Sequence, residues 1–216
     1  MSSLALLAGA QGAAAFGGGP YPITDMSLEG TRVNSTWRFD GEDERVRAER
    51  LGISWREGLD ARLSGGVELG FLYLRPRTRN PAMDARGWYL GFDLRYHAWS
   101  RGPFALDLGA GYRYMDADDE RDEQRLRLHA HRAEVGVAGT WRVAERLRLS
   151  AGTSRVYLEG EERLRGPVDR TVDLRQRERF LHRLGAEVVT AGPGGIGLEY
   201  RQGAEDGWQL YARREF

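Results

Sequence analysis

An alternation of apolar and polar residues with a period of two runs along this chain from about residue 30 onward. The clearest example is the stretch GWYLGFDLRYHAWS, which begins at Gly87. Its apolar face carries Trp88, Leu90, Phe92, Leu94 and Tyr96, and its other face carries Asp93, Arg95 and His97. Successive side chains of a strand point to opposite faces of a sheet, so this pattern is typical of strands with one apolar face. The same pattern in GGVELGFLYL, PFALDLGAGYRYM and AEVGVAGTW predicts an all-β chain.

Continued along the chain, the alternation predicts ten strands. They lie near 30–39, 44–56, 62–75, 87–99, 103–115, 125–142, 147–158, 174–190, 195–202 and 207–216. In 44–56, 125–142 and 147–158 the apolar residues do not keep to one face throughout. Either a β-bulge or an extension of the strand beyond the apolar band explains such a change.

The predicted connections alternate in length. One set is short (REGLD, SRGP, VAER, AGPGG), and the other is generally longer and acidic (DGEDE, RPRTRNPAMDARG, DADDERDEQ, EGEERLRGPVDRTVD, QGAED). Short turns at one end and longer loops at the other are typical of outer-membrane barrels, with both termini on the periplasmic side. We therefore expect a closed antiparallel up-and-down transmembrane β-barrel of ten strands. Eight strands is the alternative, because 44–56 and 195–202 give the weakest patterns.

The last ten residues, GWQLYARREF, form an amphipathic strand that ends in an aromatic residue. Closure of a barrel pairs the last strand with the first, so neither is an open edge. Here the chain resembles the small bacterial outer-membrane β-barrels over roughly residues 28–216. In that family the C-terminal strand typically ends in Phe with apolar residues at alternate positions before it, a pattern associated with the barrel-assembly machinery. Trp208, Leu210, Ala212 and Phe216 match the pattern, and Arg214 departs from it.

Periodicity alone does not distinguish a membrane barrel from a soluble barrel or sandwich. Aromatic residues gather towards the strand ends, as interfacial girdles require, and glycines gather on the polar face, as a crowded lumen requires. We therefore expect an outer-membrane protein of a Gram-negative bacterium. Residues 1–15 are interpreted as a signal-peptide remnant, 16–28 as a periplasmic segment and 29–216 as one barrel domain. The sequence has no run of about 18 apolar residues.

With lipid outside, the polar face lines the lumen. Its predicted arginines are Arg32, Arg38, Arg56, Arg95, Arg113, Arg132, Arg148, Arg177, Arg183 and Arg201. Its predicted carboxylates are Glu68, Asp93, Asp107, Glu134, Glu187 and Glu199. A ten-stranded barrel lies near the size at which side chains fill the interior, so we expect a packed network of ion pairs. The arginine surplus then needs water, loop carboxylates or an anion, which leaves a narrow anion-preferring channel as the alternative.

Composition narrows the remaining function classes. Arginine supplies all the basic residues, and 32 basic residues balance 32 acidic ones, so no global field favours nucleic acid. The chain has no Cys, and no other pattern calls for a cofactor. His129 and His131 without a carboxylate make a weak metal site, so no metal is expected. An Asp–x–Arg–x–His array (Asp93, Arg95, His97) comes without a placed nucleophile, so a hydrolase is the less favoured reading and a non-enzyme is predicted.

The expected partners follow from the location. They are outer-membrane lipid and lipopolysaccharide, together with the barrel-assembly machinery through the C-terminal strand. The acidic stretch DADDERDE is suited to a divalent cation that bridges lipopolysaccharide phosphates, although such runs are more often simply solvated. The loops are also where a surface ligand would bind, and the sequence does not identify one.

Overall fold

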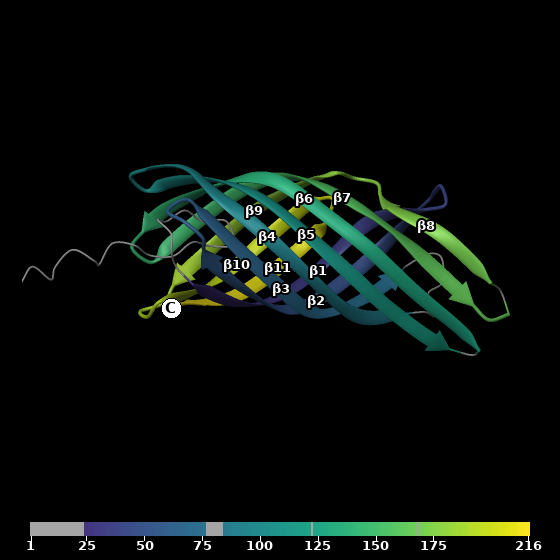
Figure 1. Ribbon diagram of the computed structural model, residues 1–216. Coiled ribbons are helices and arrows are strands. Elements are labelled where there is room, and N and C mark those ends of the chain that lie inside the picture. The colour runs from purple at the N-terminus through teal and green to yellow at the C-terminus, as the bar shows by residue number, and fades with distance from the viewer. Residues whose placement is uncertain (1–23, 77–83, 122, 168) are drawn as a thin grey trace, which may run out of the picture.

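The computed structural model describes residues 24–76, 84–121, 123–167 and 169–216, which form one antiparallel sheet that closes on itself (Figure 1). Its strands are β1 (Asp25–Phe39), β2 (Glu42–Gly58), β3 (Leu63–Pro76), β4 (Ala85–Arg101), β5 (Phe104–Arg121), β6 (Gln124–Ala144), β7 (Leu147–Arg165), β8 (Arg170–Gln176), β9 (Phe180–Val189), β10 (Gly194–Gly203) and β11 (Asp206–Glu215). β1 pairs with β2 on one side and with β11 on the other. The prediction of a closed antiparallel β-barrel is therefore confirmed. Within these residues, no helix has the length and apolar character needed to cross a membrane.

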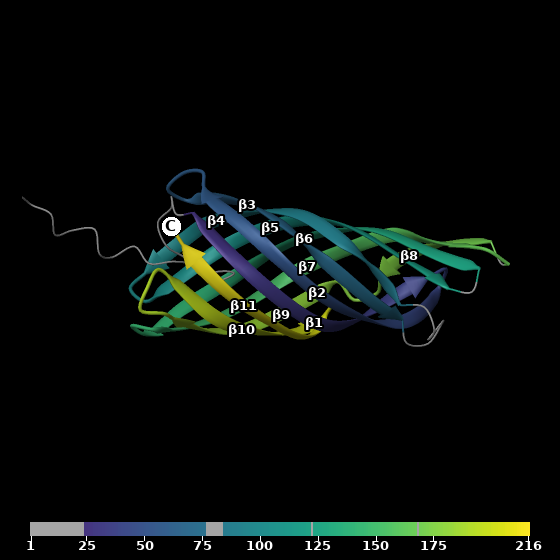
Figure 2. The same cartoon turned by 90° about the horizontal axis from the view of Figure 1, so that it is seen from below.

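The two ends of the barrel differ. At one end, here called the terminal end, the Phe216 amide donates to the Thr24 carbonyl at 2.9 Å. Strand β1 begins at Asp25, four residues before the predicted domain boundary, and the segments predicted as a signal remnant and most of the periplasmic segment lie outside the described residues. At the other end, here called the loop end, β5, β6, β7 and β8 project furthest (Figures 1 and 2).

The barrel narrows from ten strands to eight along its length. Near the terminal end, β7 pairs with β9, and the ring continues through β10 and β11 to β1. Near the loop end, β8 alone joins β7 to β1, pairing with β7 at 159–164 and with β1 at 37–39. We call these parts the wide section and the narrow section. Both strand counts weighed from the sequence are therefore present, at different heights of one barrel.

The narrowing comes from a sideways step in the chain. Sequence periodicity predicts one strand over 174–190, but the structure has two, β8 and β9, separated by residues 177–179. The step opens room between β9 and β1, and the β10–β11 hairpin fills it. Backbone hydrogen bonds from Arg177 to Thr36 and from Val156 to Arg179 secure the step. Which strand lies beside another depends on how the whole ring closes. The alternation of residues within one segment carries no information about this.

Two predicted acidic loops are largely strand. β5 continues to Arg121 and β7 to Arg165, so much of DADDERDEQ and EGEERLRGPVDRTVD belongs to the wall of the narrow section. Their outward charges alternate with small or apolar residues that point inward, such as Ala117 and Val172. Most of the acidic residues of these segments therefore belong to an exposed outer face and not to an irregular loop, whereas Glu162 points inward and is 6% exposed.

The extension of strands into the narrow section also explains why the apolar residues of some strands change from one face to the other. β5 and β6 pair without interruption from Phe104 and Trp141 to Arg121 and Gln124, so β6 has no bulge at the point where its apolar residues change face. Leu128 points inward and Val135 outward, with exposed fractions of 4% and 54%. Of the two explanations, extension beyond the apolar band is therefore correct. The register shifts that do occur lie near the terminal end, at 97/99 and 142/144.

The outer face of the wide section is apolar and exposed. We call this surface the apolar belt: Leu28, Leu51, Ile53, Val67, Leu69, Phe71, Leu90, Phe92, Leu94, Leu106, Leu108, Val135, Leu149, Leu184, Val188, Ile196, Leu198 and Leu210. Large aromatic residues such as Trp88, Trp141 and Trp208 are also exposed on this face. An apolar surface of this extent is unfavourable in water and suited to hydrocarbon.

The narrow section reverses this arrangement and has a mostly apolar interior, in which the polar side chains Glu44, Glu162 and Gln176 are also buried. Its core contains Val33, Trp37, Phe39, Val46, Ala48, Leu72, Leu74, Ala85, Tyr89, Met115, Ala117, Leu126, Leu128, Ala130, Leu158, Val172 and Leu174. All of these residues are at most 5% exposed. An eight-stranded ring is just wide enough for side chains to fill it. The narrow section is therefore packed like the core of a soluble protein.

Candidate functional site

The lumen of the wide section is filled by charged side chains. Its inward carboxylates are Asp25, Glu29, Glu68, Asp93, Asp107, Glu134, Glu187, Glu199, Glu205 and Glu215. Its inward arginines are Arg50, Arg56, Arg95, Arg113, Arg132, Arg148, Arg183, Arg201 and Arg213. The two signs nearly balance within the described chain. The arginine surplus expected from the sequence is therefore not found.

The prediction that Arg32 belongs to the ion-pair network of the lumen is wrong. The Arg32 side chain is 64% exposed on the outer face, with Nε 3.3 Å from Glu49 Oε1. Its neighbours Thr31 and Val33 point inward, and the strict alternation of β1 therefore turns Arg32 outward. Arg38 and Arg177 are also on the outside, where both pair with Asp43.

Six of the inward residues form a closed ring of ion pairs that joins β6, β9, β10 and the β10–β11 turn. In order around the ring they are Arg201, Glu199, Arg183, Glu134, Arg132 and Glu205. We call this the ion-pair ring. Five of the six were predicted from the sequence as lumen residues. Each carboxylate lies between two guanidinium groups, which offsets the cost of burying it.

Glu205 was not predicted, because it belongs to a turn. Only Ala204 and Glu205 separate β10 from β11, and Gly203 makes the turn possible with φ of +102°. A Cβ on Gly203 would lie 2.3 Å from the Phe180 carbonyl oxygen, so only glycine fits. Asp206 Oδ1 accepts from the Gly203 amide at 2.9 Å. The turn folds inward, and Glu205 is 5% exposed.

Glu205 binds three arginines from three strands. Arg50 of β2 donates from Nη1 and Nη2 to the two carboxylate oxygens, each at 3.0 Å. Arg201 Nη1 donates to Oε2 at 2.8 Å, and Arg132 Nη2 lies 3.7 Å from Oε1. Arg50 was also missed, since the alternation within 44–56 was clear only from Leu51 onward. The sequence did hold a signal for Arg50. Arg50 lies two residues before Gly52, so the two residues share a face, and glycines gather on the lumen face.

Two further clusters lie towards the terminal end of the lumen. Glu187 is 1% exposed and accepts from Arg213 Nη2 at 2.6 Å and from the Tyr211 hydroxyl at 3.0 Å, with Arg148 at 3.5 Å. Asp93 accepts from Arg56 Nη2 at 2.8 Å and lies 3.5 Å from Arg95 Nε. These pairs join strands that are distant in sequence, so they also fix the register of the closed ring.

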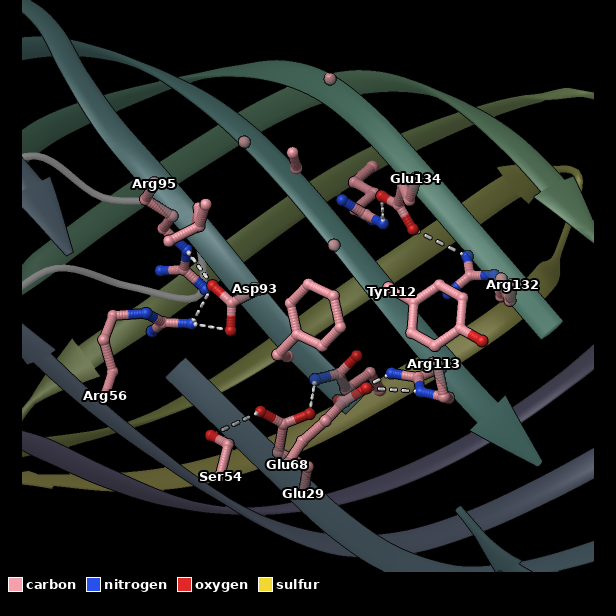
Figure 3. A pocket seen from close by; sticks show the side chains of 18 of the residues that line it. Glu29, Ser54, Arg56, Glu68, Asp93, Arg95, Tyr112, Arg113, Arg132 and Glu134 are labelled. Carbon is pink, nitrogen blue, oxygen red and sulfur yellow. Dashed lines mark hydrogen bonds and ion pairs between the residues drawn. The ribbon is translucent and has the colours of Figure 1, made fainter. Parts of the chain in front are cut away.

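A cavity of about 130 Å³ remains at the centre of the wide section (Figure 3). Charged groups line it, among them Glu29, Glu68, Asp93, Arg113 and Arg132. Arg113 donates to both oxygens of Glu68, at 2.6 and 2.8 Å, and Gln209 donates to Glu29 at 2.7 Å. A polar cavity of this size has room for several water molecules. Towards the loop end it is closed by the ion-pair ring and the apolar core.

The histidines are divided between the two faces. His97 Nδ1 lies 2.8 Å from Asp107 Oδ1, on the neighbouring strand, inside the terminal end. His129 and His131 face outward beside Tyr114 and Tyr112. No group of three or more His, Asp or Glu side chains suited to a metal occurs in the part of the chain that the structure describes. The contact of His97 and Asp107 is of the kind that orients a catalytic base, and we see no nucleophile bonded to His97 among the described residues.

The residues predicted as the assembly signal share one surface. Trp208, Leu210 and Ala212 point outward on β11, and the Phe216 ring is 68% exposed at the terminal end. β11 pairs with β1 along nearly its whole length, which places these side chains at the closing seam. Recognition of this strand by the assembly machinery stays a prediction.

Comparison with known proteins agrees with this geometry at the level of the fold. The outer membrane protease OmpT from Escherichia coli superposes with a TM-score of 0.52 at 14% identity, covering 91% of this chain and 95% of that one. The β-domain of the Bordetella autotransporter BrkA superposes with a TM-score of 0.53 at 13% identity, covering 91% and 99%. No family model and no curated protein matches the sequence.

The fold and the lumen define a bacterial outer-membrane β-barrel protein. Its closed antiparallel sheet is shared with these solved barrels, and its apolar belt is exposed on the outside of the wide section, as in barrels that face lipid. The protein therefore belongs in the outer membrane of a Gram-negative bacterium, as the sequence predicted. At 13–14% identity, the likeness shows the fold and not the activity of either neighbour.

Proposed function

We propose that this protein is a closed barrel with a structural or surface-binding role, and not a wide pore. The observation that carries the proposal is that the lumen is filled at successive heights. The clusters around Asp93 and Glu187 come first, then the ion-pair ring, then the apolar core of the narrow section.

The apolar core is the strongest barrier to conduction. Core side chains such as Trp37, Leu74 and Leu174 are at most 3% exposed. An ion that left the central cavity towards the loop end would lose most of its water in this core, at a cost of several kcal/mol or more. The core is mostly apolar, although it also contains the buried polar side chains Glu44, Glu162 and Gln176. The narrow section therefore serves better as a rigid extension beyond the membrane than as a conduit.

The two alternatives have less support. An anion-preferring channel was favoured by an arginine surplus, and the inward charges nearly balance once Arg32, Arg38 and Arg177 are placed outside. A hydrolase would need an accessible nucleophile beside a base. The His97–Asp107 pair lies inside the lumen, where its side chains are 12% and 1% exposed. We propose that the protein is not an enzyme.

The outer face of the narrow section is the proposed binding surface. It carries charged residues in cross-strand pairs, such as Asp116 with Arg127 at 3.3 Å and Asp118 with Arg125 at 3.8 Å. The side chains of these arginines are more than half exposed and can reach lipopolysaccharide phosphates. The aspartates already have arginine partners, so direct contact by arginine is better supported than a bridging divalent cation.

Single-channel recording in planar bilayers tests the closed state. We expect the wild-type barrel to be silent, because the core blocks the narrow section. A variant that removes core volume, with Trp37 and Leu174 both changed to Ala, should show measurable openings and acts as the positive control. Steady conductance of the wild type that falls on Arg113→Gln would contradict the proposal and favour the channel.

A further inference from the structure

The turn residue Glu205 is held in the manner of a bound ligand. Its carboxylate accepts two parallel hydrogen bonds from Arg50 and a third from Arg201, and it lies beside Arg132. Such paired donation from one guanidinium is the geometry in which arginine recognises a carboxylate. All three arginines lie on strands of the wall, whereas Glu205 enters from a two-residue turn. The arginines are thus a fixed site, and the carboxylate is the tethered component.

The arginine site has unused capacity. Arg132 is 5% exposed and lines the central cavity, and no described residue accepts a hydrogen bond from its Nε. Arg50, Arg132, Arg183 and Arg201 face Glu29, Glu134, Glu199 and Glu205 in this region. Removal of Glu205 therefore leaves one buried positive charge without a counter-charge, next to a cavity of about 130 Å³.

The turn that carries Glu205 is also held by contacts of its neighbours Gly203 and Ala204, which do not involve the arginines. Apart from the β10–β11 pairing, the Ala204 amide donates to the Phe180 carbonyl at 2.7 Å, and the Gln176 side chain donates to the Ala204 carbonyl. The Gly203 amide donates to Asp206 Oδ1 within the turn, and Gly203 pairs with Leu181 of β9. Ala204 packs only in a small cluster with Val156 and Leu181. The β1–β11 ladder ends at Asn34 and Asp206, so β1 does not pair with the turn itself. The Glu205 carboxylate is the one charged group by which the two turn residues contact the arginines of the wall.

We infer that Arg50, Arg132 and Arg201 form a carboxylate-binding site that Glu205 occupies as a tethered ligand. A free small carboxylate and Glu205 compete for the site. Its ligand class is a monocarboxylate, either a small organic acid or a carboxylate group carried by a larger molecule. Occupation by a free carboxylate displaces the β10–β11 turn from beneath β8.

Chemical rescue of a Glu205→Ala variant tests the site. Thermal unfolding of the purified barrel in detergent is followed in sodium formate and, at equal ionic strength, in sodium chloride. We expect the variant to have a lower Tm than the wild type in chloride. Formate should raise its Tm in a saturable manner, because a ligand stabilises the state that binds it according to its concentration relative to Kd.

Matched variants establish that the effect belongs to this site. Glu49→Ala removes an exposed carboxylate one residue from Arg50 and should show no formate dependence. The double variant with Glu205→Ala and Arg50→Leu should lose the formate response. A Tm of Glu205→Ala that is the same in formate and chloride, or an equal formate response in all three variants, overturns the inference.

Displacement of the turn has its own readout. The chain has no cysteine, so Ala204→Cys creates a unique thiol at a position that is 1% exposed. With Glu205 still present, modification by a charged maleimide should be slow in chloride and faster in formate. Equal rates in the two salts refute competition. This measurement also tests the competition between formate and Glu205 if Glu205→Ala fails to fold in either salt.

Discussion

Removal of the Glu187 carboxylate should destabilise the barrel far more than removal of an exposed carboxylate. Glu187 is 1% exposed and lies against Arg213, Arg148 and Tyr211, with its closest oxygen 2.6 Å from Arg213 Nη2. The Arg213 and Arg148 side chains are themselves 3% and 5% exposed. Glu187→Ala therefore removes the carboxylate that two buried guanidinium groups share, while Arg213 keeps its ion pair with Glu215. Breaking a buried pair in this way costs about 3–5 kcal/mol.

The matched control is Glu49→Ala. Glu49 also pairs with an arginine, but the Glu49 and Arg32 side chains are 43% and 64% exposed. Exposed pairs of this kind contribute about 0–1 kcal/mol. Urea unfolding of both variants in lipid vesicles, followed by the gel mobility shift of the folded barrel, compares the two free energies of unfolding. If Glu187→Ala lowers the free energy by no more than Glu49→Ala does, the idea that ion pairs stabilise the lumen is wrong.

Three further changes test other parts of the molecule. Leu174→Ala, at 0% exposure in the narrow section, should cost about 2–5 kcal/mol by the same unfolding assay, and a cost below 1 kcal/mol would mean that the core is loosely packed. Asp93→Ala should cost a few kcal/mol but less than Glu187→Ala, because the Asp93 side chain is 29% exposed; the reverse order would contradict the link between burial and cost. Purified barrel should not turn over lipopolysaccharide, phospholipid or peptide. Turnover that is abolished by His97→Ala in a barrel that still folds would reveal an enzyme.

The strands and their outward faces were predictable from the sequence, because the side chains of a strand alternate and a membrane demands an apolar belt. Alternation placed Phe92 and Leu94 on one face and Asp93 and Arg95 on the other, and the aromatic residues at the strand ends and the glycines of the polar face assigned the first face to lipid. The same rule failed for Arg32. There β1 passes beyond the belt, where the inward face becomes apolar at Val33 and the outward face becomes charged. A period reports which residues share a face and not which medium that face meets.

The sequence by itself determined the alternation that makes each segment a strand, the antiparallel order of those strands, and many of the charges that line the lumen, such as Asp93, Arg132 and Glu187. Only the tertiary structure decided that β8 and β9 take different neighbours, that the ring narrows from ten strands to eight, and that Glu205 completes the ion-pair ring. The physical reason is that strand formation depends on residues two apart, whereas ring closure and charge pairing depend on residues as distant as Arg50 and Glu205. Those residues meet only when the whole barrel has closed.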